Sequence, residues 1–292
     1  MPSLKAIRNR IASVKNTQKI TRAMKLVAAA RLRRSQDSMI AARPYAKRLQ
    51  EVIADLAARL SAVGDEAAHP LLQRREIKKV RIIVVSSDRG LAGGYNSNLN
   101  RRAERFVIDE KANYESIELV TVGRKAREHF KRRNTNVVKE YNGVTSETAL
   151  TRAREIAADA TRDFLEGKID SVMIAFNEFK SAIAQNVVLD QLLPLPTSDL
   201  SPNEGRNDFE YEPSKEEVLS TILPLYIESQ LYRVMLEAIA SFFAAQMTAM
   251  DSATKNAKEM ISNLTLEFNR ARQAAITKEL MEIVGGAEAL KG

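Results

Sequence analysis

The two ends of the chain lack the residues that interrupt helices. Residues 3–63 contain no Gly and one Pro, Pro44, and residues 225–284 contain neither. Gly and Pro are the strongest local breakers of helical structure, so we predict one long helix at each end. Pro44 and Pro224 are expected as bends inside continuous helices. Two remote helices that must each bury an apolar stripe most simply bury it against each other.

The N-terminal segment has a coiled-coil period. Alternate steps of four and three residues from Ile7 to Val63 pass through seventeen positions, of which thirteen are apolar. This pattern predicts a left-handed coiled coil. The polar members of the seam fall between Gln18 and Ala46, so this thin stretch either packs closely or meets other partners. At a rise of 1.5 Å per residue the helix would span about 90 Å, more than a small domain is wide.

The C-terminal segment begins with a helix-capping pattern. Ser214 and Glu217 have the spacing of a capping box, directly after Pro213. The predicted apolar seam that follows consists of Val218, Ile222, Leu225, Tyr232, Leu236, Ile239, Phe243, Met250, Ala253, Ala257, Met260 and Leu264.

Positive charge is concentrated in the first helix. Residues 1–50 hold thirteen Lys or Arg and one acid, Asp37, for a net +12, whereas the whole chain carries +8. The remaining residues therefore sum to −4. A solvated helix face is the common explanation of such a charge run, but its density beside a thin seam favours an acidic partner surface.

Composition excludes several classes of protein. The chain has no run of 18 apolar residues, so we expect no membrane-spanning helix. It has no Cys, which rules out disulfides and fits a reducing compartment. The Arg-rich start resembles a mitochondrial transit peptide, but its heptads continue into the long helix. His69 and His129 lack ligand spacing, so no metal site is expected.

The middle of the chain alternates strands and helices. Strands are predicted at 80–85, 117–122, 137–138, 171–179 and 183–193, and helices at 96–111, 124–133 and 147–166, followed by a loop over 194–213. This order predicts a mostly parallel five-stranded sheet covered by helices, with its last two strands antiparallel. The fold class is thus an antiparallel coiled coil plus an α/β domain, with boundaries at 1–75, 76–212 and 213–292.

A glycine-rich turn, residues 86–96, follows the first strand. Doubly wound sheets bind phosphate at this place. The turn lacks both the dinucleotide fingerprint and the P-loop ending, so a structural turn is the better interpretation. No Ser/His/Asp set, paired carboxylates or metal cluster appears elsewhere. We therefore expect no catalytic site and no cofactor.

Four segments together resemble the gamma subunit of F-type ATP synthase. They are KITRAMKLVAAAR (19–31), SDRGLAGGYN (87–96), QLLPLP (191–196) and NRARQAAITKELMEIVGGA (269–287). The similarity spans essentially the whole chain, in the family's order. It implies a non-catalytic subunit, one copy per complex, that forms the central rotor shaft inside a ring of alternating alpha and beta subunits. The shaft couples proton-driven rotation of the membrane ring to ATP synthesis or hydrolysis.

The resemblance also implies contact residues. Residues matching the family's contacts with the beta subunit and the catalytic ring are Lys15, Lys19, Arg22, Met24, Lys25, Arg272, Gln273, Thr277 and Glu279. Those matching the foot, which meets the membrane c-ring beside the epsilon subunit, are Phe209, Glu210 and Tyr211. Membrane association would be indirect, at the cytoplasmic face of a bacterial inner membrane. Ala92 stands where many relatives carry Cys, and Gln246 where some carry a basic residue, which puts that one contact in doubt.

Two other functions compete with this interpretation. A basic region followed by heptads also occurs in nucleic-acid-binding zipper proteins. Against it, an apolar face of Ile7, Ile11, Val14, Ile20, Met24 and Val27 runs through the basic region, and residues 1–44 lack aromatic side chains. A dinucleotide-dependent enzyme would rest on the glycine turn alone.

Overall fold

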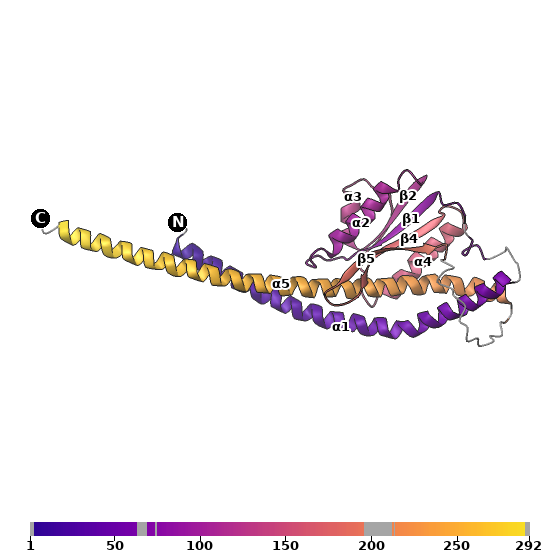
Figure 1. Cartoon of the computed structure of the whole chain (residues 1–292), viewed down its shortest axis with the longest axis horizontal. Coiled ribbons are helices and arrows are strands. Elements are labelled where there is room, and N and C mark those ends of the chain that lie inside the picture. Colours follow the sequence, from indigo (N-terminus) through magenta and orange to yellow (C-terminus); the bar gives the residue numbers. More distant parts are fainter. Residues whose placement is uncertain (1–2, 63–68, 74, 196–211, 213, 290–292) are drawn as a thin grey trace. The chain divides into compact units, whose positions relative to one another are not determined.

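The computed structural model describes residues 3–62, 69–73, 75–195, 212 and 214–289 (Figure 1). The chain forms two compact units, one of Met1–Ala28 with Met247–Gly292 and one of Ala29–Gln246. Its elements in chain order are α1 (Leu4–Ala62), β1 (Lys79–Val85), α2 (Tyr95–Asp109), β2 (Ser116–Val122), α3 (Arg124–Lys131), β3 (Val137–Tyr141), α4 (Ala149–Leu165), β4 (Ser171–Phe179), β5 (Gln185–Leu193) and α5 (Lys215–Ala289).

The two long helices begin at hydroxyl caps and continue through their prolines. Ala6 donates its N–H to Ser3 Oγ at 3.2 Å, and Glu217 donates its N–H to Ser214 Oγ at 3.2 Å. Pro44 lies inside α1 and Pro224 inside α5, as predicted. α5 also runs through Gly285 and Gly286.

The sheet has the predicted mostly parallel arrangement. Its strand order is β3-β2-β1-β4-β5, with only β4 and β5 antiparallel. β3 is longer than predicted, because Lys139 and Glu140 pair with Val120 and Thr121 of β2 although their side chains are charged. A charged edge strand is also protected from pairing with another sheet.

The core of the α/β domain lies between β1 and the helices α2 and α3. Alternate β1 residues, Val80, Ile82 and Val84, are buried with Leu99 of α2 and Phe130 of α3. The intervening β1 residues point to the opposite face, which α4 covers. The alternation of a strand thus gives one purely apolar layer and one layer that can carry polar groups.

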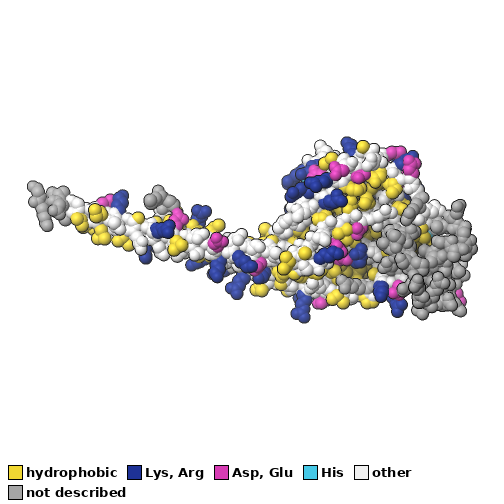
Figure 2. Space-filling model, in the orientation of Figure 1, with side chains coloured by type: hydrophobic (Ala, Val, Ile, Leu, Met, Phe, Trp, Pro, Cys, Tyr) yellow, Lys and Arg dark blue, Asp and Glu magenta, His cyan; other side chains and the backbone are white. Residues whose placement is uncertain are grey.

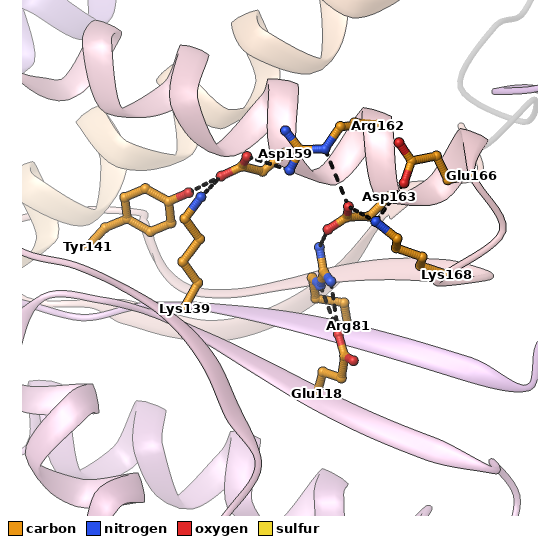
Figure 3. A network of polar contacts seen from close by, with 9 residues as sticks. All are labelled: Arg81, Glu118, Lys139, Tyr141, Asp159, Arg162, Asp163, Glu166 and Lys168. Atoms are coloured by element: carbon orange, nitrogen blue, oxygen red, sulfur yellow. Dashed lines mark hydrogen bonds and ion pairs between the residues drawn. The ribbon is translucent and has the colours of Figure 1, made fainter.

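The α4 face of the sheet contains a polar network (Figure 3). Arg81 of β1 donates from Nη1 to Asp163 Oδ2 at 2.7 Å and from Nη2 to Glu118 Oε2 at 2.9 Å. Asp159 of α4 accepts bonds from Lys139 and Tyr141 of β3, and its other oxygen accepts from Arg162 at 2.9 Å. Burial opposes the charge on Arg81, yet its two carboxylate partners raise its pKa. The network fastens α4 to three strands.

α5 is buried on several faces where it crosses the larger unit. Tyr95, the first residue of α2, packs edge-to-face on Phe242 at 5.6 Å between ring centroids, and Arg31 of α1 lies over the ring of Phe243 at 5.6 Å. The sequence predicted a single stripe. A residue placed on it, Leu225, is exposed, because the stripe that α5 buries there is wider and rotated toward the sheet domain.

Candidate functional site

The smaller unit is an antiparallel pair of helices. Lys25 Nζ lies 2.5 Å from Asp251 Oδ1, Thr21 Oγ1 lies 2.8 Å from Thr254 Oγ1, and Arg8 stacks over the ring of Phe268 at 5.7 Å. Partners on α5 move backward as residues on α1 move forward. The predicted antiparallel coiled coil is therefore confirmed in this unit.

The predicted seam of α1 is buried or half-buried at every described position from Ile7 to Ile53. On α5, buried residues recur every seven positions, at Met250, Ala257 and Leu264. Met260 is exposed, so its assignment to the seam is wrong. The polar seam residue Thr21 is buried, and its hydroxyl forms a hydrogen bond with that of Thr254. A seam with polar members can therefore still pack closely.

The basic stripe, defined here as Lys15, Lys19 and Arg22, occupies one exposed face of α1 at the i, i+4, i+7 spacing of a helix. Within the described ranges these three side chains form no ion pair with an acidic residue. Lys25 continues the run but is paired with Asp251, and Met24 is half-buried. Of the four basic residues predicted as contacts on α1, three therefore have no ion pair within the described part of the chain and can meet a partner.

Apolar side chains stand beside the basic stripe. Ile20 is 60% exposed, and Leu26 and Val27 are similarly exposed. The apolar face that argued against nucleic-acid binding thus includes two exposed residues, Ile20 and Val27, because the buried seam turns away from them. Figure 2 shows dark-blue and yellow side chains intermixed along the helices of the smaller unit. A surface that mixes basic and apolar groups suits a protein partner better than a phosphate backbone.

Among the described residues, no helix lies beside the end of α5. Since Arg8 meets Phe268 and α1 begins at Leu4, residues beyond about 273 of α5 lie past the start of α1. The predicted contact residues Arg272, Gln273, Thr277 and Glu279 are all exposed. So are five apolar residues of the same segment: Ile276, Leu280, Met281, Ile283 and Val284.

An open recess lies between α1, α4 and α5 in the larger unit. Its volume is about 1190 Å³. The lining includes the exposed apolar side chains of Tyr45, Leu150 and Leu225, beside the ion pair of Arg154 Nε with Glu228 Oε1 at 2.8 Å. This recess is a second place where apolar side chains of the larger unit are exposed. The foot residues Phe209, Glu210 and Tyr211 lie outside the described residues, and Gln246 is half-buried.

The glycine-rich turn contains a carboxylate, that of Asp88, which accepts two backbone hydrogen bonds. Asp88 accepts the N–H of Arg124, the first residue of α3, at 2.9 Å and the N–H of Gly143 at 2.9 Å. The free N–H groups at the N-terminus of a helix often bind a phosphate, and here the carboxylate of Asp88 accepts one of them. At the end of the turn, Tyr95 donates its hydroxyl to the carbonyl of Ala238 in α5 at 2.8 Å. The turn thus joins the strand ends to α5.

Neither histidine belongs to a group of three or more potential metal ligands among the described residues. His129 Nε2 lies 3.0 Å from Glu104 Oε2, and burial, opposed by this bond, lowers its pKa. No group of His, Cys, Asp or Glu in the described ranges has a metal-binding arrangement. Within those ranges, no helix combines the length and apolar character required to span a membrane.

The chain is similar to known proteins over almost its whole length. The family model described as ATP synthase matches residues 3–290. A relative from Anaeromyxobacter sp. (strain Fw109-5), called ATP synthase gamma chain, is 50% identical with all of both chains covered. The protein of the same name from Geobacter metallireducens is 48% identical, again over both full lengths.

Two solved structures share the fold. A chain from the Euglena gracilis mitochondrial ATP synthase, OSCP/F1/c-ring, rotational state 3, has a TM-score of 0.63 at 16% identity, covering 98% of this chain and 94% of that one. A chain of the Tetrahymena thermophila mitochondrial ATP synthase central stalk/c-ring has a TM-score of 0.61 at 24% identity, covering 80% and 99%.

Proposed function

The chain belongs to the ATP synthase gamma chain family, and from this premise we propose that it is the central rotor shaft of an F-type ATP synthase. In this role it couples rotation of a membrane c-ring to ATP synthesis or hydrolysis in a surrounding ring of alpha and beta subunits. The observation that carries the proposal is the unaccompanied end of α5 with its exposed apolar side chains.

Exposing the apolar side chains of an unpaired helix end to water is unfavourable in free energy. Ile276, Leu280 and Ile283 are exposed at the i, i+4, i+7 spacing of one helix face, on a segment that α1 does not reach. Contiguous exposed apolar surface marks a site of protein contact. A socket at the centre of the catalytic ring would cover this end on all sides while leaving it free to turn.

The basic stripe supports a sliding contact. Exposed ion pairs contribute only about 0–1 kcal/mol each, so they can be broken and remade at every step. Lys15, Lys19 and Arg22 are free to make such pairs with acidic loops of the beta subunits. A deeply buried interface along the same helix would instead resist rotation.

The larger unit is suited to be the foot of the shaft. Tyr95 and Phe242 fasten α5 to the glycine-rich turn, and the polar network fastens α4 to the sheet, so a force on the sheet reaches the helix through short contacts. We assign the epsilon subunit and the c-ring to this unit. The chain supplies no catalytic group of its own and associates with the cytoplasmic face of the membrane only through these partners.

Rotation itself tests the proposal. The chain contains no Cys, so an Ile108→Cys change places a unique thiol on the exposed surface of α2. A bead attached there should rotate in one direction when the purified complex with alpha and beta subunits hydrolyses ATP. Hydrolysis by the complex with a stationary bead, or failure of the chain to purify with alpha and beta subunits, would refute the assignment.

The basic stripe has its own test. Changing Lys15, Lys19 and Arg22 together to Gln keeps helix propensity and should leave folding intact, while ring binding weakens more at low than at high salt. A nucleic-acid-binding protein would instead lose salt-dependent affinity for DNA with a slope reduced by about three.

A further inference from the structure

Lys25 differs from the basic stripe in having an acidic partner on its own chain. Its ammonium is 2.5 Å from Asp251 Oδ1, across the helix pair. The side chain of Lys25 is 41% exposed and that of Asp251 is 31% exposed. The charge is therefore neutralised internally but remains open to solvent, and hence to a partner surface.

Asp251 is shared by two lysines. Lys255 Nζ lies 2.9 Å from Asp251 Oδ2, while Lys25 occupies Oδ1. The bond from Lys25, followed by that from Lys255, lowers the pKa of Asp251 to about 2. The carboxylate is thus charged near neutral pH, and protonation plays no part in its behaviour there.

Few interactions within the chain are lost when the Lys25 ammonium separates from Asp251. If Lys25 leaves, Asp251 keeps Lys255 and is not left as an unpaired charge. The neighbouring turn stays joined by the Thr21–Thr254 bond at 2.8 Å, so the helix pair does not open. An exposed pair of this kind contributes little to stability, so an acidic loop within reach can match it.

We propose that Asp251 is a specificity-determining residue of the shaft, which competes with the acidic partner surface for the Lys25 ammonium. Lys255 holds Asp251 when Lys25 turns outward. The free cations of the basic stripe attract an acidic loop at every rotational position, whereas Lys25 engages only when a loop comes close enough to displace Asp251. This inference rests on the proposed function.

The test is a set of binding measurements on full-length variants with the purified alpha/beta ring, at low and high salt. Asp251→Asn removes the competitor and should tighten binding about two- to fivefold at low salt, the range that corresponds to a pair of up to about 1 kcal/mol. Lys25→Gln should weaken binding in the natural chain, but by less than it does in the Asp251→Asn background. In the Asp251→Asn background it should abolish the gain.

A matched control separates competition from net charge. Glu259→Gln adds the same charge on an exposed position of α5 about two turns away and leaves the Lys25–Asp251 pair intact. There, Lys25→Gln should have the same small effect as in the natural chain. Both changes are isosteric, and circular dichroism checks that the helices persist.

An equal effect of Lys25→Gln in the natural chain, in Asp251→Asn and in Glu259→Gln would overturn the proposal. Asp251 would then be only a structural partner of Lys25. Failure of the proposed function looks different. In that case the variant of Lys15, Lys19 and Arg22 would also leave ring binding unchanged at every salt concentration.

Discussion

Replacing Arg81 by Met removes the centre of the polar network while retaining an apolar stem of similar length. The Arg81 side chain is 11% exposed, and its partners Asp163 and Glu118 are 14% and 26% exposed. Removing one partner of a buried charge pair typically costs about 3–5 kcal/mol. Asp163 keeps Arg162 at 3.5 Å and Lys168 at 3.7 Å, and Glu118 can reach water, so we expect a loss of about 2–3 kcal/mol in the free energy of unfolding.

The measurement must report on the sheet, because α1 and α5 contribute 59 and 75 residues of helix and dominate circular dichroism. Hydrogen exchange of the β1 and β2 amides in increasing urea gives the required local stability. Arg152→Met, which breaks an exposed pair with Glu155 on α4, is the control and should cost less than about 0.5 kcal/mol. Adding Glu118→Gln to Arg81→Met should recover about 1 kcal/mol, because the stranded carboxylate is then neutral. Equal effects of Arg81→Met and Arg152→Met would refute the reasoning.

Three further predictions concern the larger unit. Burial alone would raise the pKa of Asp159 and Asp163, but their hydrogen-bonded and cationic partners lower the pKa of both carboxyls below the ordinary 3.8. Both carboxylates therefore stabilise the fold above that pH, and the urea midpoint should fall as the pH drops below about 4. An Asp159→Asn chain should show a shallower fall. Gly93 has a φ of 56°, so Gly93→Ala should cost about 1 kcal/mol in a thermal melt, whereas Gly94, at −81°, needs no positive φ and its Ala variant should cost less; equal losses would contradict this. Phe242→Ala should lower the free energy of unfolding by about 3–5 kcal/mol and speed amide hydrogen exchange in the glycine-rich turn. Unchanged hydrogen exchange there would show that the turn does not depend on α5.

The long-range pairings that shape the site could not be predicted from the sequence. Heptad spacing placed Lys25 on the seam but could not supply Asp251, because the partner depends on the register at which two remote helices meet. Asp88 likewise caps α3 only because three strand ends converge at one edge of the sheet. The width of the buried surface on α5 required knowing that it meets both α1 and the sheet domain, although the apolar run near Phe242 was a visible signal.

What the sequence determined by itself was periodic and local. Missing Gly and Pro, together with the seam from Ile7, predicted α1 and α5, and the alternation of short apolar runs predicted five strands of which only the last two are antiparallel. These features follow from backbone geometry, which acts between residues a few positions apart. Only the tertiary structure decided which charges are free, as in the basic stripe, and which are neutralised, as in Lys25. The reason is that the state of a charge depends on distances between segments that the chain brings together only on folding.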